Sequence, residues 1–319
     1  MSKIKTAFHL LEHNKKGFIA QIIKKCGYLF PDKCYMRLLY YFQLGKKLDL
    51  DNPQYFTEKL QWLKLYDRKE IYTKLVDKYE VKSIVAKRIG DKYIIPTIGV
   101  WDNPDDISWD SLPDRFVIKT TFGGGSDGVY ICKHKNNEAI ERIKKGLVKS
   151  MKTNPYKRLR EWPYKNVPKR IIAEVFLDEA TGDLRDYKFY CFNGIPKVLL
   201  IASNRYTSHN FDYFDMDFNK LPITSAMGPN NPQIATMPGN FEEMQTIARK
   251  LSAGLPHVRI DLYNCNGQIY FGEMTLYDSS GFDNLNSDEW DLRFGNWITL
   301  PAKEDKDKSL GCQGIDMFY

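Results

Sequence analysis

Residues 258–277, VRIDLYNCNGQIYFGEMTLY, constrain the fold more than any other stretch of this sequence. Two apolar, aromatic-rich segments flank Asn264, Asn266 and Gly267, which are residues that favour turns. This pattern predicts a β-hairpin. Polar side chains that a plain hairpin does not need are set into both strands, and they point to a functional role.

These side chains are Arg259 and Asp261 in the first strand and Glu273 and Thr275 in the second. Because side chains of a strand alternate between its two faces, the members of each pair share a face. A two-residue loop would put Asp261 and Glu273 on opposite sides of the hairpin, whereas a three-residue loop ending at Gly267 would put them on the same side. We expect the three-residue loop.

Two carboxylates on one side of a hairpin repel each other unless a proton or a cation lies between them. All-oxygen ligands with open positions suit a Mg²⁺ ion that also holds phosphates. Asp261 and Glu273 are therefore candidate metal ligands. A surface hairpin with scattered charges is the alternative for this stretch taken alone.

The chain has 319 residues, enough for two or three compact subdomains with cores of their own. A hydrophobic content of 43% and a charged content of 27% are typical of a soluble globular protein. We expect no transmembrane helix, because no apolar run reaches about 18 residues, and no secretory signal at the N-terminus. The six cysteines are far apart, which predicts reduced thiols in a cytosolic compartment.

The net charge of +7 is concentrated in residues 1–50, which carry ten bases and three acids. Apolar positions at helical spacing make this segment a predicted basic, partly amphipathic helical region. It could rest on an anionic membrane surface or an acidic polymer, or it could be a solvated helix face rich in lysine. No nucleic-acid motif is present, so nucleic acid is not an expected partner.

A glycine-rich turn, GGGSDG, separates two predicted strands, FVIK and VYICKH. Successive glycines let backbone N–H groups approach an anion and form a nest for phosphates. No helix follows directly, so the turn matches neither the P-loop nor the dinucleotide fingerprint, and a flexible hairpin tip is the alternative. The candidate phosphate-binding residues are the preceding strand lysine and the turn itself, namely Lys119, Gly123, Gly124, Gly125 and Ser126.

The rest of the pattern predicts a mixture of helices and strands. Helices are expected after an N-cap at Thr57 and over residues 71–88, 137–151 and 241–254. Strands are expected over residues 171–177 and on both sides of Asn193 and Gly194, whereas residues 204–240 read as irregular.

The order of these features resembles the ATP-grasp superfamily, which holds ATP between two α+β subdomains. Within it the sequence is similar to the TupA-like group, associated with bacterial capsule and teichuronopeptide synthesis. The blocks that carry the resemblance, over roughly residues 50–300, include NPQYFTEKLQWLKLYDR, KLVDKYEVKSIVAKRIGDKYIIP, LPDRFVIKTTFGGG, RIIAEVFL, DYKFYCFNG, VRIDLY and GQIYFGEMTLY.

The resemblance implies an α+β fold of the ATP-grasp type with a helical N-terminal segment. The expected parts are a basic helical segment (1–50), an N-terminal α/β subdomain (51–112), a subdomain with the glycine-rich loop (113–175) and a C-terminal subdomain with the metal site (176–319).

The resemblance also assigns a nucleotide site that binds ATP. Lys119 would bind its phosphates under the glycine-rich loop, and Lys188 would contact the nucleotide. Adenine or ribose would meet four successive residues, Glu174, Val175, Phe176 and Leu177.

Asp261 and Glu273 would coordinate Mg²⁺ in the same site. Superfamily members often carry Asn two residues after the metal Glu; this chain has Thr275, whose hydroxyl can still take a coordination position. Where many relatives have an Arg after the D-K-Y block, this chain has Lys82, so its contact with phosphate stays open.

ATP-grasp enzymes mostly activate a carboxylate as an acyl phosphate, which an amine then attacks to form an amide. Arg259 is the first candidate for holding the acyl phosphate or the acceptor carboxylate, and Arg185 is the second. The resemblance thus implies a carboxylate–amine ligase that joins an amino acid or small amine to a uronic acid of a capsular or O-antigen glycan, or to a sugar nucleotide. It would be cytoplasmic, with residues 1–50 at the inner face of the bacterial membrane.

Two alternatives to the ligase remain. A glycosyltransferase that uses a nucleotide sugar could employ the D-x-D of Asp215 and Asp217, although this spacing is common by chance. An ATP-binding scaffold without turnover would bind ATP but release no ADP.

Overall fold

The computed structural model describes residues 15–124, 128–205, 207–233 and 235–303. The predictions for Gly125, Ser126 and the first fourteen residues of the basic segment lie outside the described residues.

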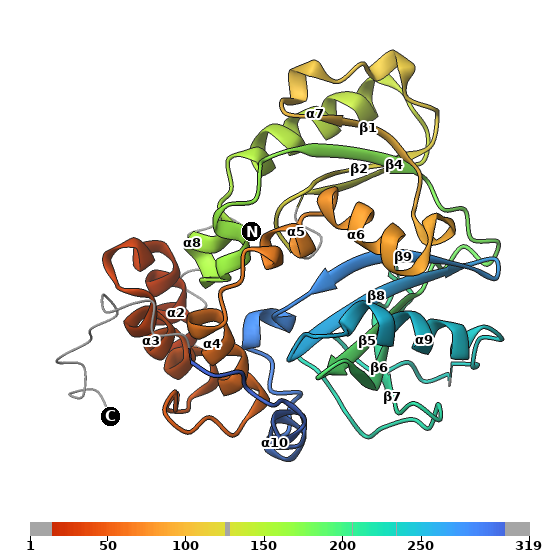
Figure 1. The fold of residues 1–319 in the computed structure, drawn as a ribbon. Coiled ribbons are helices and arrows are strands. Elements are labelled where there is room, and N and C mark those ends of the chain that lie inside the picture. The colour runs from red at the N-terminus through yellow and green to blue at the C-terminus, as the bar shows by residue number, and fades with distance from the viewer. Residues whose placement is uncertain (1–14, 125–127, 206, 234, 304–319) are drawn as a thin grey trace.

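Helices make up the first part of the described chain, as the apolar spacing predicts. They are α2 (Lys15–Cys26), α3 (Asp32–Leu44), α4 (Phe56–Tyr66), α5 (Ile71–Val76) and α6 (Glu80–Ile89). Gly45 ends α3 with a φ of 74°, a left-handed conformation that glycine adopts without a Cβ clash. Figure 1 shows α2 and α3 packed together at one end of the molecule.

The start of α4 differs from the prediction. The helix begins at Phe56 with Tyr55 as its N-cap, so Thr57 lies inside the first turn. There the Thr57 backbone N–H and hydroxyl donate to the Asp291 carboxylate at 2.9 and 2.8 Å. Thr57 is therefore an anchor between helices and not a cap.

The single helix predicted over residues 71–88 is divided into α5 and α6. The Asp77 carboxylate accepts hydrogen bonds from the backbone N–H groups of Tyr79, at 2.8 Å, and Glu80, at 3.3 Å. Such bonds satisfy the free donors at a helix start, so a new helix begins here. Lys78 therefore lies in the turn between the two helices.

The first sheet has four antiparallel strands in the order β1-β4-β2-β3. Their bounds are β1 (Thr97–Trp101), β2 (Phe116–Thr120), β3 (Val129–Cys132) and β4 (Ile171–Val175). Helix α7 (Asn137–Met151) has the predicted bounds and covers one face, where its Leu147 belongs to the same buried core as Phe116 and Ile118. The opposite face carries Lys119 and Glu174.

The second sheet has five antiparallel strands in the order β7-β6-β5-β8-β9. Their bounds are β5 (Asp186–Phe192), β6 (Ile195–Ser203), β7 (Asn210–Phe214), β8 (His257–Cys265) and β9 (Gln268–Thr275). Helix α9 (Phe241–Ser252) covers one face, where the Phe241 ring stacks on Phe189 with 6.0 Å between centroids. Because strand side chains alternate, Lys188 and Asp261 lie on the other face.

Strand β7 lies in the region predicted to be irregular, residues 204–240. It pairs antiparallel with β6, with Phe211 opposite Ala202. The turn-forming residues around β7 obscure its strand pattern in the sequence. Pairing with β6 defines it as a strand. Helix α10 (Asp288–Trp297) then completes the described fold.

The loop of the hairpin has two residues, Asn266 and Gly267, with φ of 51° and 85°, so the three-residue prediction is wrong. Asp261 nevertheless lies directly opposite Glu273, because Gly272 is an extra residue that forms a β-bulge and shifts the register. The two carboxylates therefore share a side, as expected, for a different physical reason.

The cysteine prediction needs a correction. Free thiols in the described chain are Cys26, Cys132, Cys191 and Cys265. Cys34 on α3 is disulfide-bonded, so the prediction of reduced thiols is wrong for this residue. Cys312 lies outside the described residues.

Two antiparallel sheets with helices on their outer faces form an α+β fold, which confirms the predicted fold class. Figure 1 shows the four-stranded sheet in the upper part of the view and the five-stranded sheet below it, with α5 and α6 beside the space between them.

The bulge at Gly272 supplies a test of the register. A Cβ at this position would lie 3.0 Å from the Asp261 carbonyl oxygen, and that backbone atom is fixed by the sheet. We expect Gly272→Ala to lower the free energy of unfolding by about 1–3 kcal/mol, as overpacking does. Urea unfolding measures it, with Gly239→Ala as the control, because among the described residues none beyond its two chain neighbours lies within 4 Å of a Cβ there. Equal stability of the two variants would contradict the assigned register.

Candidate functional site

The acidic pair predicted from the hairpin lies on the face of the five-stranded sheet opposite α9. Asp261 on β8 is only 3% exposed and faces Glu273 on β9. The Thr275 hydroxyl donates to Glu273 Oε1 at 3.1 Å. The three predicted metal ligands are therefore brought together.

Arg259 binds this pair from within the same strand. Its Nε and Nη2 donate to the two Asp261 oxygens at 2.7 and 2.8 Å, and Nη2 lies 3.4 Å from Glu273 Oε1 and 3.2 Å from the Thr275 hydroxyl. Its Nη1 pairs with Asp278. Burial opposes the charge, but Asp261 and Asp278 outweigh it and raise the pKa of Arg259. The guanidinium is thus a fixed positive charge in the site.

Two lysines complete the positive charge around the acids. Lys188 on β5 lies opposite Asp261 and forms an ion pair with it. Lys78, which follows α5, lies 3.5 Å from Glu273 Oε2 and donates to the Gly123 carbonyl at 2.7 Å. Lys78 therefore connects the glycine-rich turn with the acidic pair.

Lys78 was not among the predicted site residues. Its block, KLVDKYEVK, is visible in the sequence, but an uninterrupted helix would have placed this lysine among other surface charges. The available signal is Asp77, a residue type that starts helices, in the middle of the predicted one.

Glu174 on β4 lies between two lysines on the inner face of the four-stranded sheet. Lys119 Nζ is 2.5 Å from Glu174 Oε2, and Lys82 on α6 pairs with the other oxygen. Lys82 also donates to the Ile95 carbonyl and the Thr97 hydroxyl, both at 2.8 Å. Burial opposes ionisation, but both lysines outweigh it and lower the pKa of Glu174. The structure thus places Lys82 beside Lys119, the lysine predicted to bind phosphates. The sequence had left the phosphate contact of Lys82 open.

Three of the predicted nucleotide contacts follow Glu174, at the end of β4 and in the segment that leads from it to the second sheet. Val175 is exposed, and its backbone N–H donates to the Pro96 carbonyl at 3.1 Å. Phe176 and Leu177 are half-buried, and the Arg115 guanidinium lies 4.2 Å from the Phe176 ring centroid. Their contact with adenine or ribose stays a prediction.

Arg185 is not part of the charged cluster. Its Nε lies 3.4 Å from Asp183, and within the described chain no hydrogen bond or ion pair joins it to Asp261, Glu273 or Arg259. Its catalytic role stays a prediction with less geometric support than that of Arg259.

The Asp215 carboxylate of the D-x-D is engaged in closing a turn. It accepts hydrogen bonds from the backbone N–H groups of Asp217, at 3.0 Å, and Asn219, at 2.8 Å, and from the Asn219 side chain at 3.0 Å. Aspartates commonly form such turns, which accounts for the pattern without a metal.

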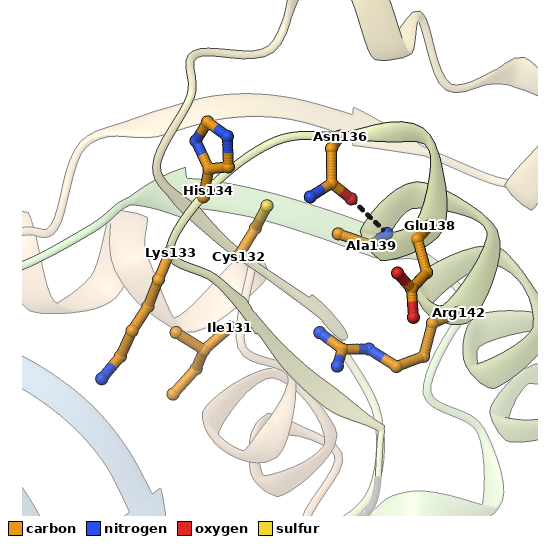
Figure 2. Close-up of a pocket in the computed structure, with 8 residues that line it drawn as sticks. All are labelled: Ile131, Cys132, Lys133, His134, Asn136, Glu138, Ala139 and Arg142. Carbon is orange, nitrogen blue, oxygen red and sulfur yellow. Dashed lines mark hydrogen bonds between the residues drawn. The ribbon is translucent and has the colours of Figure 1, made fainter.

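A pocket of about 420 Å³ lies elsewhere, at the free edge of the four-stranded sheet (Figure 2). It lies between β3 and the start of α7, where Asn136 accepts a hydrogen bond from the Ala139 N–H at 2.8 Å. It is lined by Ile131, Cys132, Lys133, His134, Asn136, Glu138, Ala139 and Arg142. None of the predicted site residues lines it.

The chemistry of the donor set fits Mg²⁺. The described residues contain no group of three or more His, Cys, Asp or Glu side chains that could hold a metal. Two carboxylates and a hydroxyl leave positions open for phosphate oxygens, which is how Mg²⁺ usually binds in phosphate-transfer sites. Asp261, Glu273 and Thr275 therefore fit an ion shared with a polyphosphate.

Lysines, a glycine-rich turn and an acidic pair lie on the two sheets, and such groups are suited to a polyanion and a cation. A family model described as TupA-like ATPgrasp matches residues 58–299, more than half of the sequence. The chain therefore belongs to the TupA-like ATP-grasp family. No curated protein matches it.

Several solved structures share a distant similarity with the chain. Two crystal structures of D-alanine–D-alanine ligase from Bacillus anthracis, one complexed with ATP, are each 15% identical, with TM-scores of 0.38 and 0.39. These matches cover 64% and 70% of this chain and 57% and 65% of theirs. The Helicobacter pylori ligase is also 15% identical, with a TM-score of 0.43 over 76% of this chain and 69% of its own. The chain thus spans less than two thirds of the Bacillus enzyme.

Glu273 predicts a specific pH dependence. Burial opposes its ionisation, but Lys78, Lys188 and Arg259 outweigh it and lower the pKa of Glu273 from 4.5 to about 2. A lowered pKa stabilises the fold at pH values above the pKa of the unfolded state, and this stabilisation is lost as the pH falls toward 2. We expect the stability difference between wild type and Glu273→Gln to shrink by about 2 kcal/mol between about pH 6 and 3.

Urea unfolding across this pH range measures the effect. The control is Glu141→Gln, because the Glu141 side chain is 59% exposed and its ion pair among the described residues is with a surface lysine, Lys144. If the difference in free energy of unfolding between wild type and Glu273→Gln does not change with pH, the three cations do not stabilise the Glu273 carboxylate.

Proposed function

We propose that the chain is an ATP-dependent carboxylate–amine ligase that acts through an acyl phosphate. The observation that supports this most directly is the charged cluster on the five-stranded sheet. Asp261 and Glu273 lie side by side, and Arg259, Lys188 and Lys78 contact them from three different elements. Such a cluster can stabilise the charge that develops on a transferring phosphoryl group.

ATP would bind between the two sheets with its phosphates near Lys119 and Lys82. Both lysines already lie at Glu174, so their ammonium groups are held in place before the nucleotide arrives. The turn at Gly123 and Gly124 would cover the phosphates with backbone N–H groups. Residues 174–177 would line the adenine or ribose.

Mg²⁺ would be held by Asp261, Glu273 and Thr275. When bound, it supplies positive charge that neutralises phosphate oxygens and orients them for transfer. The residues around it have their own tasks: Lys188 and Arg259 fix the Asp261 carboxylate, and Lys78 ties Glu273 to the glycine-rich turn.

The reaction would proceed in two steps. A carboxylate oxygen of the first substrate bonds to the γ-phosphorus as the bond to ADP breaks, which gives an acyl phosphate. The amine of the second substrate then bonds to the acyl carbon as the carbon–oxygen bond to phosphate breaks, and the amine loses a proton. Arg259 faces the acidic pair and would hold the oxygens of the acyl phosphate.

The first substrate would be a uronic acid of a capsular or O-antigen glycan or of a sugar nucleotide, and the second an amino acid or small amine. Support for this finer assignment comes from the setting of the TupA-like group. A polymer rich in carboxylates also complements the excess of ten bases over three acids in residues 1–50.

A substrate screen tests the ligase. With ATP and Mg²⁺, phosphate release should require both a uronic acid and an amine, and mass spectrometry should detect the amide. Asp261→Asn should lower turnover by about 100-fold or more, because it removes preorganised charge from the site. Lys197→Met is the control, because Lys197 is exposed, and this variant should keep wild-type turnover. ATP binding without ADP release, or thermal stabilisation by nucleotide sugars alone, would contradict the ligase.

We propose in addition that α2 contacts an anionic membrane surface. Ile19, Ile22 and Leu29 are 37%, 45% and 63% exposed and lie along α2 and the turn after it. The helix has lysines at both ends and no acidic residue. Exposed apolar side chains flanked by lysines favour the interface of an anionic bilayer. None of the helices in the described ranges is long and apolar enough to cross a membrane.

Vesicle sedimentation tests this contact. The chain should bind vesicles that contain phosphatidylglycerol and not vesicles of phosphatidylcholine alone, and added salt should weaken the binding. Ile19→Ser with Ile22→Ser should lower binding by about tenfold or more, because two apolar anchors are lost. Ile195→Ser, 47% exposed on β6, is the matched control. Wild-type binding by the double variant would refute the proposal.

A further inference from the structure

A turn of left-handed backbone follows β9 directly after the metal-ligand candidates. Ser279 and Ser280 have φ of 45° and 55°, and Gly281 has φ of 69°. Residues with a Cβ disfavour this region because of clashes with the backbone, so surrounding contacts have to hold the two serines there.

Those contacts come from α4, far away in the sequence. Gln61 Nε2 donates to the Ser280 and Gly281 carbonyls at 3.0 and 2.8 Å. Lys64 Nζ donates to the Ser280 carbonyl at 2.6 Å and to its hydroxyl at 2.8 Å. Gln61 and Lys64 are both fully buried, so neither can touch a bound substrate.

Two further acceptors lie near Lys64 Nζ, the Gln61 side-chain oxygen at 3.0 Å and the Leu159 carbonyl at 3.2 Å, so its three N–H groups are shared among four acceptors. Burial lowers the pKa of Lys64, and the attraction of the Glu161 carboxylate opposes this shift. A buried ammonium is costly unless hydrogen bonds satisfy it, and here two of those bonds go to Ser280. Two of the four acceptors around Lys64 Nζ thus belong to the turn.

The left-handed turn also contacts Arg259, the arginine of the site. It begins at Asp278, whose carboxylate pairs with Arg259 Nη1 and accepts a hydrogen bond from the Tyr190 hydroxyl at 2.9 Å. Arg259 contacts Asp261 and Glu273 with its other donors. A continuous chain of polar contacts therefore runs from α4 to the acidic pair.

We propose that Lys64 and Gln61 are positioning residues that hold the left-handed turn and thereby orient Asp278 and Arg259 for the reaction. This inference rests on the proposed function. It assigns to α4 a task in catalysis, since Lys64 acts on Arg259 only through the turn.

The first test compares two lysines of the same helix. Lys59, like Lys64, donates to two backbone carbonyls, those of Gly295 and Ile298, both at 2.9 Å, but these lie on the side of α10. Lys64→Met should lower kcat for ADP release by about 100-fold, because small displacements of catalytic groups have such effects. The Kd for Mg·ATP should stay within about twofold, and Lys59→Met should keep wild-type kcat. Equal kcat in the two variants would overturn the proposal.

The second test restores the turn in another way. Glycine adopts the left-handed region without a Cβ clash, so Ser279→Gly should raise kcat of Lys64→Met by about tenfold or more. A merely structural lysine would lower stability, and glycine at residue 279 would not restore kcat. Absence of this rescue would overturn the proposal.

Hydrogen exchange separates this inference from the ligase proposal. If no uronic acid and amine support turnover, the amides of residues 277–282 still report the turn. They should exchange faster in Lys64→Met than in Lys59→Met, and Ser279→Gly should slow them again. Equal exchange in both lysine variants would overturn the positioning role, whatever reaction the site performs.

Discussion

The structure depends on one electrostatic constraint, the repulsion between the Asp261 and Glu273 carboxylates. Both are placed side by side by a sheet that fixes their backbones, so the charges cannot separate. Positive side chains from different parts of the fold offset this repulsion. They are Arg259 on β8, Lys188 on β5 and Lys78 in the turn between α5 and α6. Because these elements are distant in sequence, the site forms only when the whole chain has folded.

The hairpin shows how far the sequence determines the site. Alternation along each strand was sufficient to place Arg259 beside Asp261 and Thr275 beside Glu273. Alternation was not sufficient to predict the register between the two strands, because the register depends on both the loop length and a bulge. A single glycine in a strand, Gly272, is the only trace of that bulge in the sequence, and glycine occurs in strands for other reasons.

Lys78 shows a different limit. Its position follows from the break between α5 and α6, and that break is stabilised by Asp77, which also binds Arg170 at 2.7 Å across the fold. Periodicity of apolar residues continues through the break, so a one-dimensional pattern favours one long helix. The helix start becomes evident only when the tertiary partner of Asp77 is known. For the same reason β7 could be recognised only from its pairing with β6.

The lysines proposed to bind phosphates are each paired with a carboxylate, and this pairing has a physical consequence. Lys119 and Lys82 converge on the buried Glu174, so folding alone already orders their flexible side chains. Ordering long side chains costs entropy, which a preformed pair removes from the binding step. Glu174 also offsets part of their charge, so phosphates would have to compete with it. In the proposed ligase, this pairing would exchange some binding affinity for a fixed geometry of the two lysines.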